Sequence, residues 1–222
     1  MFAYAANEGI KFHFSPAYSP HFGGLWEAGV KSAKFHMTRV LGHQHLTFEE
    51  LSTLFSQIEA ILNSRPLTPL SSDPTDLDPL TPGHFLIGRP LTFLPSPDLT
   101  QEKSTRLNRY QLIQQLKQHF WNRWRHEYLT ELQQRVKWRG QTRNLQEGDL
   151  VVLKENNVPP MKWRMGRIKK LYPGEDGVVR VADVHTNTGV YRRATNRLCL
   201  LLPDESDDDP RAPTVVEEGG RC

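Results

Sequence analysis

Glu27 is followed by Lys31 and Lys34 in the stretch GLWEAGVKSAK, which begins at Gly24. Positions four and seven residues apart lie on one side of an α-helix, so a carboxylate and two cations would share a face. A carboxylate can bind a hard divalent cation, and lysines beside it can hold a phosphate chain. A glutamate that only favours the start of a helix is the alternative, although a Glu–Lys pair stabilises a helix by only about 0.2–0.5 kcal/mol.

Two further patterns permit chemistry but have simpler interpretations. His43 and His45 in GHQH have a spacing that could bind a metal, yet no third ligand stands out, which favours a solvated turn. The run HFWNRWRHEY could stack on bases or cover phosphates. Its residues Phe120, Trp124 and Tyr128 recur every four positions, which is typical of the buried side of a helix. The arginines between them could still contact DNA.

Charge is distributed unevenly along the 222 residues. Residues 103–202 hold 20 Lys and Arg against 8 Asp and Glu, a net charge of +12, whereas 1–102 carry −4 and 203–222 carry −5. Such a basic segment predicts a polyanionic partner; an ordinary solvated basic surface is the alternative. The densest basic set of this segment comprises Lys162, Arg164, Arg167, Lys169, Lys170, Arg192, Arg193 and Arg197, with Trp163 between the first two.

Hydrophobic periodicity predicts helices in the first two thirds of the chain. We expect one over residues 24–41 and a second from Thr47, where Thr47 and Glu50 form a capping box, to about residue 63. A Pro-rich connector contains a short helix over 81–88, and a long helix runs from about 104 to 135. The expected buried positions are Leu25, Ala28, Val30, Ala33, Met37, Leu41, Leu51, Leu54, Phe55, Ile58, Ile61, Leu62, Leu107, Tyr110, Leu112, Ile113, Leu116, Phe120, Trp124, Tyr128 and Leu132.

From Leu145 onward the pattern changes to short strands. One strand is expected in LQEGDLVVLKE and three more between residues 162 and 194, separated by the turns PGEDG and TNTG. Closely spaced strands of this kind predict a small antiparallel barrel, which we expect to have five strands between about Leu145 and Leu202. The acidic residues 204–222 are expected to be disordered.

Several of these motifs, in this order, resemble a known family. PAYSPHFGGLWEAGVKSAK, ILNSRPLTPL and LTPGHFLIGRPL are similar to the back half of integrases from long-terminal-repeat retrotransposons, closest to the Pao/BEL type. GDLVVLKE, KWRMGRI and LYPGEDGVVRVADV resemble the C-terminal domain that follows in those proteins. The resemblance covers about residues 8–203.

The resemblance implies an α+β chain of four parts. Residues 1–95 would be the C-terminal part of the integrase catalytic core, with partial ribonuclease-H-like helices, and 96–144 a long helical linker. Residues 145–203 would be an SH3-like basic β-barrel, the integrase C-terminal domain, and 204–222 the acidic tail. The chain would then begin inside the catalytic domain and lack the family's N-terminal His/Cys zinc module.

By the same resemblance, Glu27 matches the last member of an Asp, Asp, Glu triad that binds two Mg²⁺ or Mn²⁺ ions for phosphoryl transfer. Residues 1–26 contain no Asp, so Glu27 would be a metal ligand only in a complete core. We therefore expect this fragment to be inactive alone and to need no cofactor, while the full-length parent would catalyse DNA integration. The expected DNA contacts are Lys31, Lys34, Lys162, Arg164, Arg167, Lys169, Lys170, Arg192 and Arg193.

Composition limits the other function classes. No apolar run is long enough to span a membrane, and the two cysteines, Cys199 and Cys222, favour an intracellular location, for a DNA-binding protein the nucleus. DNA is the expected partner, together with a second copy or other integrase chains. The alternative is a domesticated nucleic-acid or protein interaction module without a role in integration. A small hydrolase using Glu27 and a histidine is a third hypothesis, but no nucleophile stands out.

Overall fold

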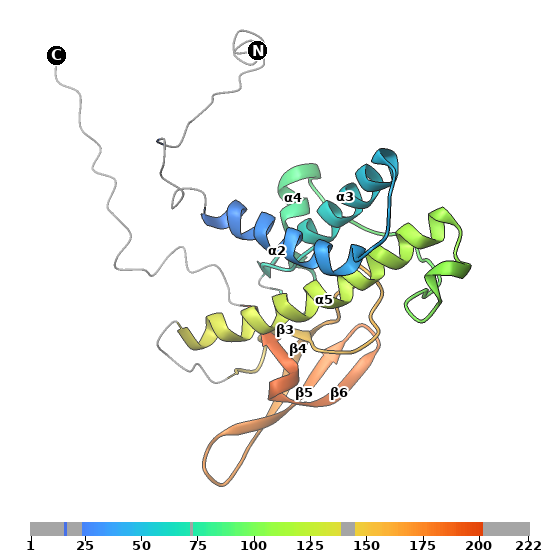
Figure 1. The fold of residues 1–222 in the computed structure, drawn as a ribbon. Helices are drawn as coiled ribbons and strands as arrows, with labels where there is room; N and C mark the ends of the chain where they lie inside the picture. Colours follow the sequence, from blue (N-terminus) through green and yellow to red (C-terminus); the bar gives the residue numbers. More distant parts are fainter. Residues whose placement is uncertain (1–15, 17–23, 72, 139–144, 202–222) are drawn as a thin grey trace, which may run out of the picture.

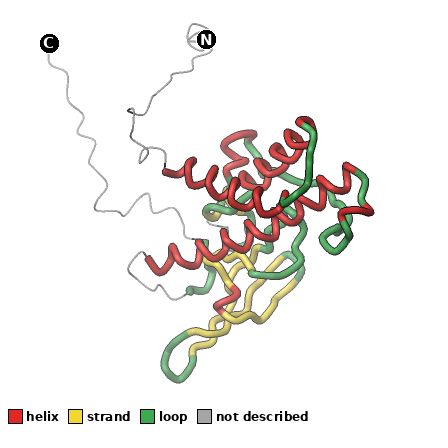
Figure 2. Tube along the Cα trace, viewed as in Figure 1, coloured by secondary structure: helices red, strands yellow, loops and turns green. Residues whose placement is uncertain are grey.

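The computed structural model describes residues 16, 24–71, 73–138 and 145–201. Helices come first and a sheet follows, which confirms the α+β class (Figure 2). The long helix α5 (Arg109–Trp138) lies between helices α2 (Gly24–Leu41) and α3 (Phe48–Asn63) and the sheet (Figure 1). Among the described residues, no helix is apolar enough over the length needed to cross a bilayer. The expected acidic tail and the start of the first family motif lie outside these residues.

Local sequence signals set the ends of α2 and α3 where they were predicted. The Thr47 backbone N–H donates to Glu50 Oε2 at 2.9 Å, and Thr47 Oγ1 accepts from the Glu50 N–H at 3.3 Å. This reciprocal capping box satisfies two backbone donors at the start of α3. Helix α2 ends before Gly42, whose φ of 51° is in the left-handed region that glycine adopts without strain.

The predicted burial of α2 and α3 is correct on one side only. Met37, Leu54 and Ile58 are buried against α5, as expected. Val30 and Phe55, both expected in the core, are 52% and 50% exposed, so those two predictions are wrong. The apolar stripes are wider than the surface that α5 covers, so these two side chains remain exposed.

The connector after α3 contains a feature that the sequence did not reveal. Strands β1 (Thr68–Pro69) and β2 (Pro79–Leu80) pair antiparallel before α4 (Pro82–Ile87). Helix α4 begins and ends where predicted, with Pro82 in its first turn and Gly88 at φ 72° after it.

Helix α5 begins later than predicted because Asn108 caps it. The Asn108 N–H donates to Gln111 Oε1 at 3.0 Å, and the Gln111 N–H donates to Asn108 Oδ1 at 2.8 Å. Residues 104–106 form the separate 3₁₀ helix η2 (Ser104–Arg106). Tyr110, expected in the core, is 69% exposed in the first turn of α5.

The middle of α5 is buried on nearly every side, polar residues included. The predicted apolar positions are buried: Leu112, Ile113, Leu116, Phe120, Trp124, Tyr128 and Leu132. Four polar residues that were not predicted to be buried are buried as well: Gln114, Gln115, Lys117 and Gln118. Trp124 stacks on Tyr128 with ring centroids 5.4 Å apart, and Trp163 meets both rings edge-on. The core interpretation of the aromatic run is therefore confirmed, and its rings are not free to stack on bases.

The sheet has five antiparallel strands, as expected, in the order β6-β5-β4-β3-β7. They are β3 (Leu150–Leu153), β4 (Met165–Pro173), β5 (Val179–Thr186), β6 (Gly189–Ala194) and β7 (Leu198–Leu200), with the 3₁₀ helix η3 (Thr195–Arg197) before β7. Within the described residues, β6 and β7 are the edges and the recorded pairs do not close the sheet. At Gly166 in β4 a Cβ atom would lie 2.5 Å from Val184 Cγ1, so glycine permits the close approach of β5.

Strand β3 joins two parts of the core. Val151 and Leu153 pack among strands, whereas Leu150 and Val152 pack with α5 and the helices above it. Alternate residues of a strand point to opposite faces, so a fully apolar strand is expected where both faces are covered. The domain boundaries expected at 95, 144 and 203 stay predictions; in the described residues α5 shares one core with both its neighbours.

Candidate nucleic-acid interface

The first candidate residues lie on the exposed side of α2. Glu27 is in the first turn of the helix, and Lys31 and Lys34 follow it; all three are exposed. Neither lysine has an ion-pair partner among the described residues, so both cations are available to a phosphate chain that passes along α2. The structure therefore brings together the three side chains that the sequence placed on one face.

The other side of α2 is joined to α5 by a cluster that the sequence did not identify. His36 Nε2 lies 3.0 Å from Glu127 Oε2, and Ser32 Oγ donates to Glu127 Oε1 at 2.9 Å. His36 is 4% exposed, and its Nδ1 is buried without a hydrogen-bond partner. Ser32 and His36 are four residues apart, but the separation of 91 positions between His36 and Glu127 hides the contact from sequence reasoning.

A second candidate surface is the outer face of β4, β5 and β6. Arg192 Nε donates to Asp183 Oδ1 at 2.8 Å, and the Tyr172 hydroxyl donates to Asp183 Oδ2 at 2.7 Å. Hydrogen bonds from Arg192 and Tyr172 lower the pKa of Asp183 to about 2. Lys170 lies beside this group, with its ammonium 5.3 Å from the Tyr172 ring centroid. This face therefore holds an oriented arginine next to a more mobile lysine.

The strand alternation expected for β4 is interrupted. A register shift between Ile168 and Lys170 leaves the consecutive side chains of Lys169 and Lys170 exposed. The side chain of Arg167 is only partly exposed. Its guanidinium donates to the carbonyl oxygens of Asp76 at 2.8 Å and Gly148 at 3.0 Å, which ties the connector after α3 to the sheet.

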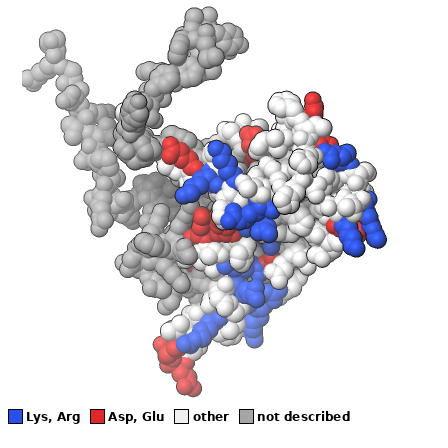
Figure 3. Space-filling model, in the orientation of Figure 1, with Lys and Arg blue, Asp and Glu red and all other residues white. Residues whose placement is uncertain are grey.

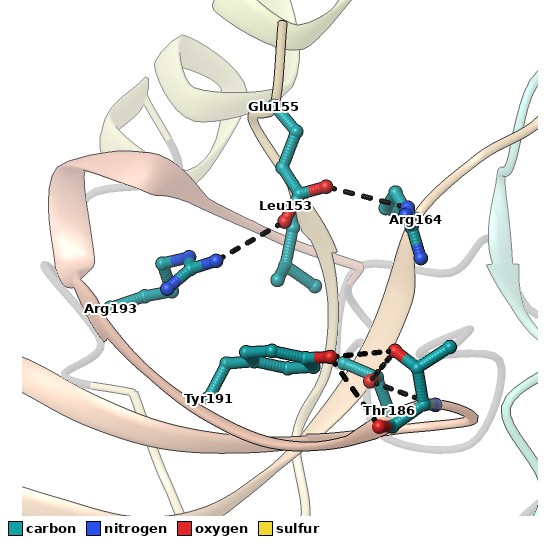
Figure 4. A pocket seen from close by; sticks show the side chains of 7 residues that line it. Leu153, Glu155, Arg164, Thr186, Tyr191 and Arg193 are labelled. Atoms are coloured by element: carbon teal, nitrogen blue, oxygen red, sulfur yellow. Dashed lines mark hydrogen bonds and ion pairs between the residues drawn. The ribbon is translucent and has the colours of Figure 1, made fainter. Parts of the chain in front are cut away.

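A cavity of about 240 Å³ lies on the inner side of the sheet. On one side of it Glu155 lies between two arginines: Oε2 is 3.4 Å from Arg164 Nε, and Oε1 is 3.4 Å from a terminal nitrogen of Arg193 (Figure 4). Leu153, Thr186, Thr188 and Tyr191 complete the lining. Arg164 and Arg193 were expected DNA contacts, whereas Glu155 and Tyr191 were missed, because only the fold brings the ends of β3 and β6 together.

Cationic side chains gather on the face shown in Figure 3, over α2, α5 and the sheet. Lys162 is exposed in the segment before β4, and Arg197 is exposed in η3. Most of the predicted contacts thus fall into three groups, on α2, on the outer face of the sheet and around the cavity. Arg167, bound to backbone carbonyls, and Lys162, in the segment before β4, belong to none of them.

The described residues do not form a site for two divalent ions. They contain no group of three or more His, Cys, Asp or Glu side chains that could hold a metal. Glu27 stands alone on α2, and one carboxylate cannot bridge two Mg²⁺ ions. His43 and His45 are both exposed next to the turn after α2. The carboxylate of Glu27 thus has no second metal-binding carboxylate beside it among the described residues.

Comparison with known proteins finds a family model that matches part of the chain. The model of a family of unknown function (DUF5641) matches residues 108–201. The match begins at the cap of α5 and ends after β7, so it spans α5 and the whole five-stranded sheet. No curated protein and no solved structure matches the chain.

Proposed function

We propose that this chain binds DNA through its basic surface, mainly by contacts to phosphates. The observation that carries the proposal is the exposed pair Lys169 and Lys170, which has no ion-pair partner among the described residues. The pair lies within a segment of net charge +12. Free lysines release counterions from DNA on binding, and they contact phosphates, which carry no base identity. The binding is therefore strong at low salt and nearly independent of sequence.

The topology supports a finer fold assignment, an SH3-like barrel. A sheet in the order β6-β5-β4-β3-β7, with a single 3₁₀ turn between β6 and β7, has the strand arrangement of such barrels. For the first helices we propose a partial ribonuclease-H-like core, supported by the motif around Glu27 on α2. Together these parts would form the C-terminal portion of a Pao/BEL-type retrotransposon integrase.

In that role the chain positions DNA and does not cut or join it. The full-length parent would catalyse integration with Mg²⁺ or Mn²⁺ held by Glu27 and two aspartates that this chain does not contain before Glu27. Integration takes place on nuclear DNA, so the nucleus is the proposed location. Other integrase chains, or a second copy of this one, are the proposed protein partners.

One observation favours the alternative, a protein interaction module. Large apolar side chains are exposed on α3 and α4: Phe48 is 80% exposed and Phe85 is 74% exposed, with Leu86 and Ile87 beside it. The consecutive exposed apolar side chains of α4 are of the kind that often marks a contact with another protein. This region is separate from the cations of the sheet, so the two functions can be tested independently.

A salt titration tests the proposal. The full chain is titrated against a fluorescent random 20-base-pair duplex at several salt concentrations. Four to six phosphate contacts predict a log–log slope of about −4 to −5. Lys169→Ala with Lys170→Ala removes two contacts and makes the slope shallower by about 1.8. The matched control is Lys103→Ala with Arg106→Ala, an equal change in charge at exposed positions in and next to η2.

Two results would contradict DNA binding. They are the absence of binding at low salt, and affinity that does not change with salt. Either would favour the interaction module, for which Phe85→Ala should then weaken capture of a protein partner or of a second copy. An equal loss in the sheet variant and in the η2 control would show general charge attraction without a defined surface.

A further inference from the structure

The cavity on the inner side of the sheet is lined by groups that a phosphate-binding site does not require. A phosphate would be served by the two guanidinium groups of Arg164 and Arg193. Between these arginines, however, the cavity holds the carboxylate of Glu155, which repels anions. It also presents an aromatic ring, that of Tyr191, which contributes little to phosphate binding. The lining therefore points to a ligand that is planar and has both donors and acceptors on its edge.

The aromatic ring is fixed in place. The Tyr191 hydroxyl lies 3.1 Å from Thr188 Oγ1, and Thr188 is joined in turn to Thr186 Oγ1 at 3.2 Å. In Figure 4 the ring lies along one side of the cavity, with Leu153 and the charged groups on the opposite side. Tyr191 is 37% exposed, and the Arg193 guanidinium lies over its ring at 5.3 Å from the centroid, so a flat group that reaches the ring from solvent would lie beside Arg193.

The charged side is fixed as well. Glu155 has an oxygen at 3.4 Å from each of the two arginines. Its backbone carbonyl accepts a hydrogen bond of 2.6 Å from the guanidinium of the buried Arg125 on α5. The segment after β3 is thereby anchored to the core. At 3.4 Å the two ion pairs are long for charge-assisted hydrogen bonds, which leaves both partners able to bind a ligand.

We infer that this cavity binds an unpaired guanine base, stacked on Tyr191, with Arg164 or Arg193 donating to N7 and O6 and Glu155 accepting from N1–H and the N2 amino group. Guanine presents acceptors on one edge and donors on the next, which matches arginines beside a carboxylate. A volume of about 240 Å³ is below the roughly 300–1,000 Å³ of sites that enclose drug-sized ligands, and it suits a single base.

Two other ligands fit the lining less well. A methylated ammonium group would be attracted by Glu155 and Tyr191 but repelled by both arginines, and the cages that bind such groups use several aromatic rings. A free carboxylate or phosphate would meet the charge of Glu155. Because bases in a duplex are paired and stacked, the inference implies a preference for single-stranded or locally opened nucleic acid. It rests on the proposed nucleic-acid function.

The main test compares single strands that differ in one base. The full chain is titrated by fluorescence anisotropy with labelled dT12 and with the same strand carrying one central dG, dA or dC. We expect the dG strand to bind about tenfold more tightly than dT12, a ratio that Tyr191→Ala reduces to about one. Tyr191→Phe should keep most of the ratio, and the matched control Tyr110→Ala, at an exposed tyrosine on α5, should leave it unchanged.

The variant Glu155→Gln distinguishes a base as the ligand of the cavity from an anion. Removing the negative charge should weaken binding of the dG strand relative to dT12, whereas a phosphate ligand would bind more tightly. The variant also tests the inference if Tyr191→Ala proves unstable in thermal unfolding. Equal affinity for all four strands in the wild-type chain would overturn the inference, as would a dG-to-dT12 affinity ratio that is larger in Glu155→Gln than in the wild type.

A nucleoside without phosphate distinguishes the guanine site from the proposed DNA-binding function. Addition of 2′-deoxyguanosine should shift the NMR signals of the Tyr191 ring, and 2′-deoxythymidine should not. Nucleoside shifts without any oligonucleotide binding would support the cavity and contradict the DNA-binding function. Salt-dependent DNA binding with no nucleoside shift and no base preference would leave that function standing and refute the guanine site.

Discussion

The cations of α2 and those of the sheet differ in what holds their side chains. Lys31 and Lys34 extend from an exposed side of α2 and have no ion-pair partner among the described residues. Arg192 is held by Asp183 at 2.8 Å, and Arg193 lies 3.4 Å from Glu155. A free lysine supplies attraction in any direction, whereas an arginine paired with a carboxylate presents its remaining donors in a fixed direction.

This difference has a structural origin. On the side of α2 that faces α5, Ser32 and His36 are held by Glu127, whereas Lys31 and Lys34 face solvent and no ion pair among the described residues orients them. Strands β5 and β6 place Asp183 opposite Arg192 in register, so the pair forms wherever the sheet forms. The comparison predicts that α2 contributes electrostatic attraction and that the sheet contributes a defined contact geometry.

The largest expected effect tests whether α5 forms the core beneath both the first helices and the sheet. Phe120 is fully buried, so Phe120→Ala should lower the free energy of unfolding by about 3–5 kcal/mol. Phe48 is 80% exposed, and Phe48→Ala should change it by less than about 0.5 kcal/mol. Urea denaturation followed by circular dichroism measures both. Similar losses in the two variants would show that α3 is covered in solution.

The next effect compares the two lysine pairs directly. Lys169→Ala with Lys170→Ala should weaken duplex binding at low salt more than Lys31→Ala with Lys34→Ala, although both variants lose two charges. The reason is that β4 is hydrogen-bonded to a strand on each side, β3 and β5, whereas the main contact of α2 is with α5. Anisotropy titrations with the same duplex measure both variants. A larger loss from the α2 pair would reverse the comparison and make α2 the main DNA contact.

How much of this could be predicted from sequence depends on the range of the interaction. The start of α3 was predictable because its cap and the partner of that cap are three residues apart, Thr47 and Glu50, whereas the start of α5 was missed although Asn108 and Gln111 have the same spacing. The burial of residues on α2 was not predictable, because Val30 would need a neighbour that the described residues do not provide. Glu155 joins Arg164 and Arg193 only after the sheet has formed, and no spacing in the sequence indicates this contact.

Arg167 illustrates the same limit within a single strand. The sequence placed it among the DNA contacts because it precedes two lysines in a basic run. The structure directs its donors to the carbonyl oxygens of Asp76 and Gly148, far from it in the sequence. Alternation along β4 also fails at the register shift after Ile168. Residue type was thus predictable, but the partner of each donor was not.

A smaller effect concerns a cation that is neither exposed nor paired with a carboxylate. Lys117 is 1% exposed, its ammonium donates to Gln114 Oε1 and lies 3.2 Å from the Phe93 ring centroid, and burial lowers its pKa to about 8. Between pH 8 and the usual lysine pKa, the unfolded chain binds more protons than the folded one. Stability should therefore rise with pH, by about 1 kcal/mol between pH 8 and 9.

Substitution at Lys117 checks the sign of this effect. Lys117→Met should remove the rise between pH 8 and 9 and should stabilise the chain most below pH 8, where the lysine is charged. Lys34→Met, at an exposed position on α2, should leave the pH profile unchanged. Denaturation at closely spaced pH values measures both, and a profile that is flat in the wild-type chain would contradict the assignment.

The smallest expected effect is at Glu27, the residue that first suggested chemistry. Glu27→Gln should leave duplex affinity within about twofold, because one exposed negative charge is a minor part of the surface field at physiological salt. Adding Mg²⁺ or Mn²⁺ to the purified chain should yield no strand-transfer product in either form, since two-metal phosphoryl transfer needs further carboxylates beside Glu27. Incubation with a labelled DNA end and a target plasmid measures this. Metal-dependent joining by the wild-type chain that is lost in Glu27→Gln would show that α2 belongs to a complete catalytic site, and it would make α2 the catalytic region of the molecule.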